Sequence, residues 1–171
     1  MTDNLADLYF APTGESKENL IKENHSEDSI VVTGNTAIDA LQLTVQSDYY
    51  HDVLNQLDPQ KKLVLVTMHR RENQGQPMRQ VFGALKEVVE DHPELEIVYP
   101  VHLSPAVQEA ANELLGGHER IHLISPLDVF DFHNLASRSY FIMTDSGGVQ
   151  EEAPSLGKPV LVLRDTTERP E

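Results

Sequence analysis

Short apolar segments rich in β-branched residues recur along the chain, and amphipathic segments lie between them. The short segments predict strands at residues 8–11, 30–33, 63–67, 96–99, 121–123, 140–144 and 160–163. The amphipathic segments predict helices at residues 16–23, 36–46, 78–91, 105–115, 130–136 and 148–156. Several strands are apolar almost throughout, as is typical of strands covered on both faces. Strands that alternate with helices predict a parallel sheet wrapped by helices, a Rossmann-like α/β fold.

Composition and charge then exclude several classes of function. The formal net charge of −15 argues against a nucleic acid or an anionic membrane as a partner. No apolar run reaches the roughly 18 residues of a membrane-spanning helix, and the first residues lack the pattern of a signal peptide. The absence of cysteine fits a cytoplasmic protein and excludes disulfides and thiolate zinc sites. A length of 171 residues by itself favours one domain.

The most informative polar stretch follows the predicted strand at 140–144. Ser146, Gly147 and Gly148 form a turn between that strand and a helix. The exposed backbone N–H groups and the dipole of a helix start favour an anion there. Glu152 lies one to two turns into the helix, where its carboxylate can accept hydrogen bonds from ribose hydroxyls. The stretch predicts a nucleotide-diphosphate site, and a solvated helix charge is the alternative for Glu152.

A second polar cluster follows the predicted strand at 63–67. It brings together His69, Arg70, Arg71 and Glu72 at a strand exit, where parallel α/β sheets bind ligands. Arginine binds phosphate oxygens in a bidentate way, and histidine donates or carries a proton near neutral pH. Lys and Arg number only 13 against 28 Asp and Glu, so their grouping here favours a phosphorylated ligand. The alternative is a loop salt bridge between Arg70 and Glu72, with His69 capping the strand.

Other strand exits carry weaker signals. His102 follows the predicted strand at 96–99, and a lone histidine in such a position is more often structural than ligand-binding. Phe130 and Phe132 follow the strand at 121–123, where either ring can stack on a base or belong to the core. Because residues two apart do not share a helical face, we expect one ring in the core and one at its rim. No metal-binding motif is present, and the remaining histidines are expected to be solvated: His25, His51, His92, His118 and His122.

Four segments together carry a resemblance to a known family. They read Thr-Met-His-Arg-Arg-Glu-Asn at 67–73, Pro-Leu-Asp-Val-Phe-Asp-Phe at 126–132, Thr-Asp-Ser-Gly-Gly-Val-Gln-Glu-Glu-Ala-Pro-Ser-Leu-Gly-Lys-Pro at 144–159, and Arg-Asp-Thr-Thr-Glu-Arg-Pro-Glu at 164–171. With them the chain resembles the bacterial non-hydrolysing UDP-N-acetylglucosamine (UDP-GlcNAc) 2-epimerases over essentially its whole length. The resemblance implies one half of a GT-B architecture, in which a UDP-sugar lies between two Rossmann-like domains. Residues 34–171 would form the C-terminal, UDP-binding domain, incomplete at its C-terminus, and residues 1–33 the end of the N-terminal half and the interdomain connection.

The same resemblance implies the reaction and the site residues. The family reaction begins with anti elimination of UDP to give 2-acetamidoglucal, and UDP then re-adds to give UDP-N-acetylmannosamine (UDP-ManNAc), without a nicotinamide cofactor or a metal. His69 would be the active-site histidine near the diphosphate, and Arg70 and His102 would contact a second, allosteric UDP-GlcNAc. The implied UDP contacts are the phosphate-binding backbone N–H groups of Ser146, Gly147 and Gly148, Arg169 at the phosphates, Glu152 at the ribose, and Phe132 and the backbone of Leu127 at the uracil.

The family's acidic catalytic residues lie in its N-terminal half. We therefore expect this chain alone to bind UDP weakly and not to epimerise UDP-GlcNAc. We expect the full-length protein to be a cytoplasmic homodimer. Two other functions remain open: a GT-B glycosyltransferase domain, which would use the same Ser-Gly-Gly turn and ribose-binding glutamate, and a non-catalytic UDP-sugar-binding module. The cluster at 69–72 favours the epimerase over the glycosyltransferase.

Overall fold

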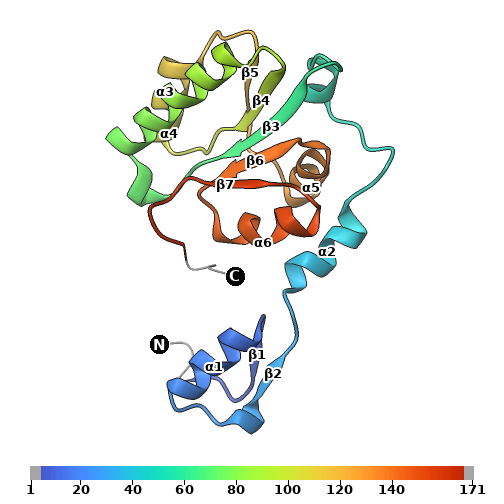
Figure 1. Cartoon of the computed structure of the whole chain (residues 1–171), viewed down its shortest axis with the longest axis vertical. Coiled ribbons are helices and arrows are strands. Elements are labelled where there is room, and N and C mark those ends of the chain that lie inside the picture. Colours follow the sequence, from blue (N-terminus) through green and yellow to red (C-terminus); the bar gives the residue numbers. More distant parts are fainter. Residues whose placement is uncertain (1–4, 168–171) are drawn as a thin grey trace. The chain divides into compact units, whose positions relative to one another are not determined.

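The computed structural model describes residues 5–167 of the chain. Its contacts group the chain into two compact units, Met1–Ala40 and Leu41–Glu171. Figure 1 colours the smaller unit blue and the larger one cyan to red. Length alone favours one domain, whereas the contacts form two units. The boundary between the units falls within α2 (Thr36–Thr44).

The smaller unit is a two-stranded parallel sheet with one α-helix. Its elements are β1 (Tyr9–Ala11), α1 (Gly14–Lys22), the 3-10 helix η2 (Glu27–Ser29) and β2 (Ile30–Val32), and β1 pairs with β2. The helix α1 begins after Thr13, whose side-chain oxygen accepts a hydrogen bond from the Ser16 N–H at 3.1 Å. This N-cap satisfies one of the backbone donors that a helix start leaves without an intrahelical acceptor.

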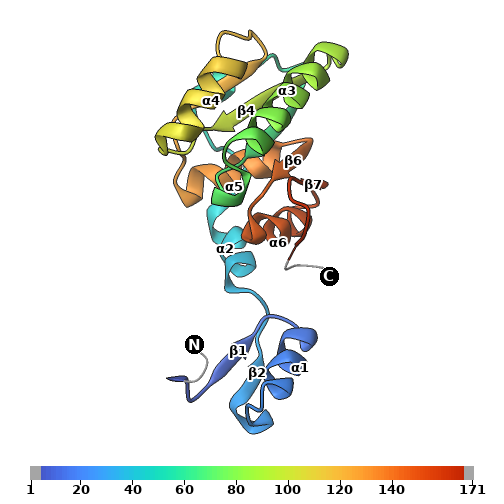
Figure 2. The same ribbon diagram turned by 90° about the vertical axis from the view of Figure 1, so that its left-hand side faces the viewer.

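The larger unit is a five-stranded parallel sheet in the order β5-β4-β3-β6-β7. Its strands are β3 (Lys62–Thr67), β4 (Leu95–Pro100), β5 (Ile121–Ile124), β6 (Phe141–Thr144) and β7 (Val160–Val162). Its helices after α2 are η3 (Asp52–Asn55), η4 (Arg71–Asn73), α3 (Gln76–Asp91), α4 (Pro105–Leu115), α5 (Val129–Arg138) and α6 (Gly147–Ser155). Figures 1 and 2 show α3 and α4 on one face of the sheet and α5 and α6 on the other. The predicted Rossmann-like α/β fold is therefore confirmed.

The side chains of the central strand β3 divide the core into two hydrophobic clusters. Val64 and Val66 belong to the cluster that contains the buried residues of α3 and α4. Leu63 and Leu65 belong to the cluster that contains the buried residues of α5 and α6. Because both faces of β3 are covered, alternate residues cannot be polar, and the strand is apolar throughout its centre. This burial explains why residues 63–66 are all apolar.

The hydrophobic periodicity predicted every α-helix and strand that the described residues contain, with ends that differ by no more than about two residues. The 3-10 helices η2, η3 and η4 were not predicted. Each is a single turn of three or four residues, which is too short for a hydrophobic period to show.

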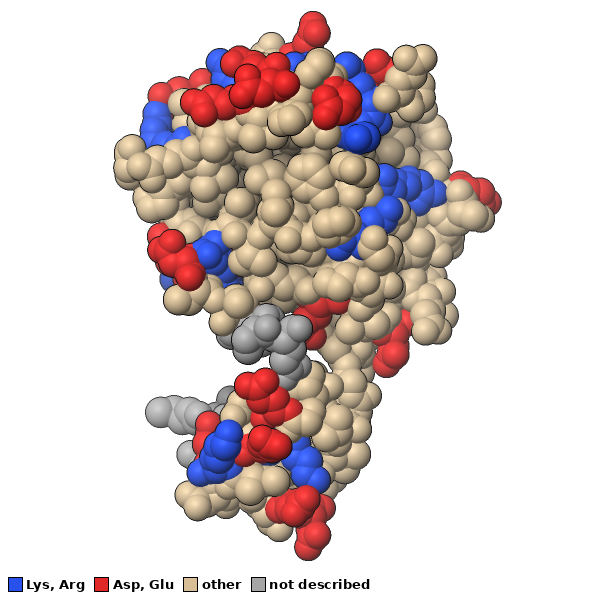
Figure 3. All heavy atoms as spheres, viewed as in Figure 1, with Lys and Arg blue, Asp and Glu red and all other residues tan. Residues whose placement is uncertain are grey.

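The strand β7 forms one edge of the sheet. Two of its side chains, Leu161 and Val162, are 51% and 41% exposed. Figure 3 shows that charged side chains gather mainly at the rim of this face of the larger unit and leave its centre largely uncharged. The edge strand is therefore apolar on a face where charge is sparse.

Glu96 is a buried charge in the interior of the sheet. Its side chain is 6% exposed, its Oε1 lies 2.7 Å from His122 Nε2, and its Oε2 accepts a hydrogen bond from the Asp58 N–H at 2.8 Å. The expectation that His122 is solvated is therefore wrong. Both carboxylate oxygens have partners, so the group ties β4 to β5 and to the turn before β3 without an unsatisfied acceptor.

The substitution Glu96→Ala is expected to lower the free energy of unfolding by about 3 kcal/mol, because it leaves His122 and the Asp58 N–H without their acceptor. Glu94→Ala is the matched control. Glu94 has a side chain that is 47% exposed, and its loss is expected to change the free energy by less than about 0.5 kcal/mol. Chemical denaturation followed by circular dichroism measures both variants, and equal losses would contradict a structural role for Glu96.

Candidate functional site

The strand β6 leads into α6 through two residues, Asp145 and Ser146. Ser146 is the N-cap residue, and its own N–H donates to Thr144 Oγ1 at 2.9 Å. Gly147 and Gly148 supply the first N–H groups of the helix, which have no acceptor within the helix. Gly147 is buried and Gly148 is exposed. The start of α6 thus offers glycine amides and the positive end of the helix dipole to an anion, with the Ser146 hydroxyl beside them.

Glu152 lies in the second turn of α6, and its side chain folds back toward the helix start. A Cβ atom built on Gly148 would lie 3.6 Å from Glu152 Oε1. The other oxygen, Oε2, lies 3.6 Å from Nε2 of His133, and the Glu152 side chain is 16% exposed. His133 comes from α5, is 3% exposed, and has its Nδ1 2.7 Å from Thr44 Oγ1. Glu152 is therefore not a freely solvated charge, because its carboxylate is held beside the amides that begin α6.

The start of α5 carries the residues predicted for the uracil. Asp128 caps this helix by accepting a hydrogen bond from the Asp131 N–H at 2.8 Å. Leu127 and Phe132 are half-buried against the hydrophobic cluster that contains α6. Phe130 is also half-buried, and its ring instead meets Tyr49 edge-on, with centroids 5.7 Å apart. The two phenylalanines therefore face different neighbours, and neither is fully buried.

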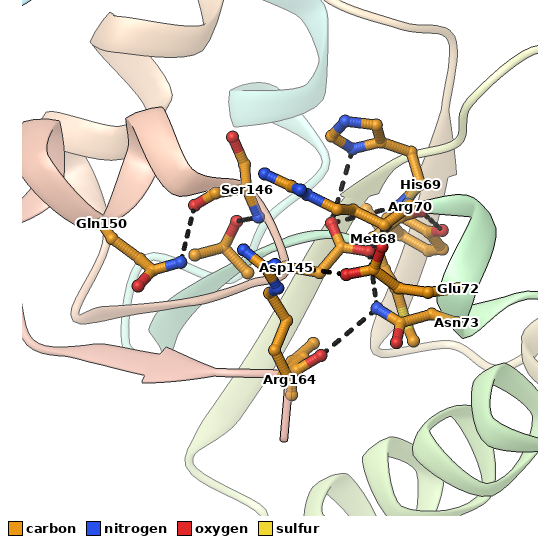
Figure 4. A network of polar contacts seen from close by, with 12 residues as sticks. Met68, His69, Arg70, Glu72, Asn73, Asp145, Ser146, Gln150 and Arg164 are labelled. Atoms are coloured by element: carbon orange, nitrogen blue, oxygen red, sulfur yellow. Dashed lines mark hydrogen bonds and ion pairs between the residues drawn. The ribbon is translucent and has the colours of Figure 1, made fainter. Parts of the chain in front are cut away.

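Asp145 joins the start of α6 to the loop that follows β3. Figure 4 shows the loop residues His69, Arg70 and Asn73 around its carboxylate. The N–H groups of His69 and Arg70 donate to Oδ2 at 3.0 and 2.8 Å, and Asn73 Nδ2 donates to the same atom at 2.9 Å. The ring Nδ1 of His69 lies 3.5 Å from Oδ1. Asp145 is 0% exposed, so a fully buried charge holds this loop against the turn at Ser146.

Glu72 pairs with Arg164, and not with Arg70 as in the alternative of a salt bridge within this loop. Its Oε1 lies 3.3 Å from Nη2 of Arg164, which follows β7, so the carboxylate faces another strand exit and not Arg70. In Figure 4 the Arg70 side chain points from its loop toward the turn at Ser146. The loop after β3 therefore adds a guanidinium to the side of the glycine turn.

A cavity of about 500 Å³ adjoins this loop. It is lined by His69, Arg70, Arg71, Gln74, His102 and Ser104. The rings of His69 and His102 are stacked, with centroids 5.7 Å apart and planes 16° from parallel. The structure thus brings together His69, which the resemblance makes the active-site histidine, and Arg70 and His102, which it assigns to a second ligand.

Two residues of the site were not predicted from the sequence. Asp145 stands within the Thr-Asp-Ser-Gly-Gly motif, so its place between a strand and a glycine turn was the available signal. His133 had no signal, since its contact with Glu152 depends on how α5 packs against α6. Arg169, predicted to bind phosphate, lies outside the described residues.

Burial raises the pKa of Tyr99, and the negative charge of Asp145 raises it further. The Tyr99 hydroxyl donates to the Met68 carbonyl at 2.8 Å, so the phenol stays protonated and fixes the exit of β3. Across residues 5–167, no group of three or more His, Cys, Asp or Glu side chains is arranged to hold a metal ion. Over the same residues, no helix has the length and apolar character needed to cross a membrane.

A family model described as UDP-N-acetylglucosamine 2-epimerase matches residues 1–171. The chain belongs to the UDP-N-acetylglucosamine 2-epimerase family. The UDP-N-acetylglucosamine 2-epimerase of Bacillus subtilis is 61% identical over the whole chain, which covers 45% of that protein. The chain thus spans about half the length of the curated relatives it matches.

Solved structures that are similar to this chain agree with the family assignment. The structure of S. aureus MnaA with UDP has a TM-score of 0.94 at 53% identity, and the match covers 98% of this chain and 46% of that one. The Neisseria meningitidis UDP-GlcNAc 2-epimerase bound to UDP-GlcNAc has a TM-score of 0.90 at 43% identity, and the match covers 99% of this chain and 47% of that one. The E. coli heptosyltransferase WaaC has a TM-score of 0.52 at 15% identity, and the match covers 86% of this chain and 42% of that one. This match shows a likeness of fold alone. That enzyme has the GT-B fold, so the predicted half of a GT-B architecture is supported.

Proposed function

We propose that the full-length protein interconverts UDP-GlcNAc and UDP-ManNAc by elimination and re-addition of UDP, and that this chain is its UDP-binding part. The observation that supports this proposal most directly is that the Glu152 carboxylate lies beside the glycines at the start of α6. Amides suit a diphosphate, and a carboxylate suits ribose hydroxyls. The S. aureus relative solved with UDP and the N. meningitidis relative solved with UDP-GlcNAc support this ligand.

The proposed contacts draw on the geometry of the site and on the family resemblance. The amides of Gly147 and Gly148 would bind the diphosphate, and Ser146 would contribute its hydroxyl, because its N–H already donates to Thr144. Glu152 would accept hydrogen bonds from the ribose. Leu127 and Phe132 would contact the uracil, and Arg169 the phosphates.

Negative charge grows on the diphosphate when the bond from its oxygen to the sugar C1 breaks. Amides already fixed at the start of α6 would stabilise that charge without having to reorient. In the elimination a proton leaves C2 and UDP leaves C1. In the return step UDP adds back to C1 and a proton adds to the opposite face of C2, so the configuration at C2 is inverted. His69 would act beside the diphosphate, and the acidic residues that the family uses would come from the N-terminal half.

The 500 Å³ cavity supports a second nucleotide-sugar site that includes Arg70 and His102. His102→Ala is expected to weaken activation by added UDP-GlcNAc about tenfold, the loss expected for about one hydrogen bond to a charged group. The measurement is the initial rate of UDP-ManNAc conversion by the full-length protein at increasing UDP-GlcNAc.

His118→Ala is the control for this prediction. Both imidazoles accept a hydrogen bond from the N–H two residues later, at 3.1 Å for His102 and 3.2 Å for His118. The loss of that local bond is therefore common to both variants. An activation curve that His102→Ala leaves unchanged would remove His102 from the second site.

Incubation of the full-length protein with UDP-GlcNAc alone tests the proposed function. Formation of UDP-ManNAc without any acceptor supports the epimerase. Tight UDP-GlcNAc binding without UDP-ManNAc would favour a glycosyltransferase, which needs an acceptor, or a non-catalytic UDP-sugar-binding module. The loop at 69–72 favours the epimerase, because its His69 and Arg70 line the cavity while their backbone N–H groups bond to Asp145 beside the glycine turn.

We also propose the organisation of the full-length protein. Residues 1–33 would belong to the N-terminal half and the interdomain connection, and residues 34–171 to the UDP-binding domain. The protein would be a cytoplasmic homodimer without a nucleic-acid partner, in keeping with a cysteine-free sequence of net charge −15.

A further inference from the structure

The carboxylate of Asp145 uses its two oxygens for different purposes. Oδ2 accepts hydrogen bonds from the N–H of Arg70 at 2.8 Å and from Asn73 Nδ2 at 2.9 Å, and it is the nearer acceptor for the N–H of His69, at 3.0 Å. Oδ1 is 3.2 Å from that same N–H and faces Nδ1 of the His69 ring at 3.5 Å. Oδ2 therefore holds the loop, and Oδ1 combines the longer bond from the His69 N–H with the contact to the imidazole.

A neutral amide would keep the shorter of the loop bonds, those at Oδ2. The oxygen of an asparagine at this position could accept all three bonds that Oδ2 now accepts, without burying a charge. Burying a carboxylate costs several kcal/mol even after the protein relaxes around it. The group that an asparagine cannot provide is a second acceptor, because its nitrogen would point at His69 Nδ1 as a donor. The contact with the imidazole is therefore what distinguishes aspartate from asparagine here.

The contact with Asp145 affects which nitrogen of the His69 ring carries the proton. The side chain is 43% exposed, and Figure 4 shows one ring nitrogen turned to Asp145 and the other turned away from it. An acceptor at Nδ1 favours the tautomer with a proton on Nδ1, which leaves the lone pair of neutral imidazole on Nε2. Contacts of this kind are often long before a ligand binds and shorten in the complex.

We propose that Asp145 is a positioning residue that fixes the tautomer of His69, so that Nε2 faces the ligand. The proposal rests on the proposed function in assigning His69 to the reaction. Asp145 itself touches neither the diphosphate nor the sugar in this assignment. It precedes the diphosphate-binding turn by one residue, so the orientation of His69 is tied to that turn.

The substitution Asp145→Asn in the full-length protein separates the two purposes of the carboxylate. It keeps the three loop bonds of Oδ2 and replaces Oδ1, which faces His69 Nδ1 and accepts the longer bond from the His69 N–H. We expect a melting temperature and a KM for UDP-GlcNAc close to those of the wild type, with kcat lowered on the order of 100-fold. Asn73→Ala is the control, because it removes a loop bond and leaves the imidazole contact. That variant is expected to melt at a lower temperature with kcat within about twofold of the wild type.

Nuclear magnetic resonance of ¹⁵N-labelled histidine measures the tautomer without reference to activity, with the His69 signal identified by its loss in His69→Gln. We expect the proton on Nδ1 in the wild type and on Nε2 in Asp145→Asn. A wild-type ring with its proton on Nε2 would overturn the proposal even if Asp145→Asn does not fold, and so would a kcat unchanged in Asp145→Asn. A wild-type protein that produces no UDP-ManNAc would instead reject the proposed function, and the tautomer would still test the role of Asp145.

Discussion

His69→Ala in the full-length protein is expected to lower kcat for the conversion of UDP-GlcNAc to UDP-ManNAc by about 10²- to 10⁴-fold. This is the range that a positioned acid or base usually contributes. The loss should fall on kcat more than on KM, because in the proposed site the principal contacts with UDP would come from α6 and would be made before reaction as well as during it. Initial rates over a range of UDP-GlcNAc concentrations measure both constants.

His92→Ala is the control for that experiment. His92 follows α3 and precedes β4, at the end of the sheet where the strands begin, whereas His69 follows the end of β3. The His92 side chain is 56% exposed, and its ring contacts Glu94. The control should leave kcat within about twofold of the wild type, since surface substitutions away from a site usually have small effects. A kcat for His69→Ala equal to that of the control would exclude His69 from the chemistry.

The second large effect is expected at Glu152. Glu152→Ala should weaken UDP binding to the full-length protein by about 1.5–3 kcal/mol, the usual contribution of a hydrogen bond to a charged group. This corresponds to a Kd about 10- to 150-fold higher. The structure strengthens the expectation, because His133 and the start of α6 already fix the carboxylate and little side-chain freedom is lost when the ribose binds.

Isothermal titration with UDP measures this change, and titration with pyrophosphate separates ribose binding from phosphate binding. Glu152→Ala should leave pyrophosphate affinity nearly unchanged. The neighbouring Glu151→Ala is the matched control on the same helix and should bind UDP like the wild type. Unchanged UDP affinity in Glu152→Ala would reject the ribose assignment.

Features that depend on local sequence were predictable. Burial on both faces of β3 requires a continuous apolar segment, and the 3.6-residue period of α3 marks a helix with one buried side. The glycine turn before α6 was also predictable, because a strand, two glycines and a helix are adjacent in the chain.

Features that depend on packing between distant segments were not predictable in the same way. Glu96 meets His122 only because β4 and β5 pair in one register. His133 meets Glu152 only because α5 and α6 pack on the same face of the sheet. Buried polar side chains carry no periodic signal of their own, so their partners become visible only in the folded chain.

The role of Asp145 lies between these two cases. Its place in the motif marks it as part of the site. Its three loop donors come from residues more than 70 positions earlier in the chain, and they reach it because Thr67 of β3 pairs with Thr144 of β6. The sequence motif therefore indicates the site, and the strand register determines what the aspartate does there.

A crystal structure of the full-length protein with UDP tests the central assignment most directly. We predict diphosphate oxygens within about 3 Å of the Gly147 and Gly148 amide nitrogens and ribose hydroxyls at about 2.7 Å from the Glu152 carboxylate. A UDP whose diphosphate lies away from the start of α6, with no ribose contact at Glu152, would contradict it.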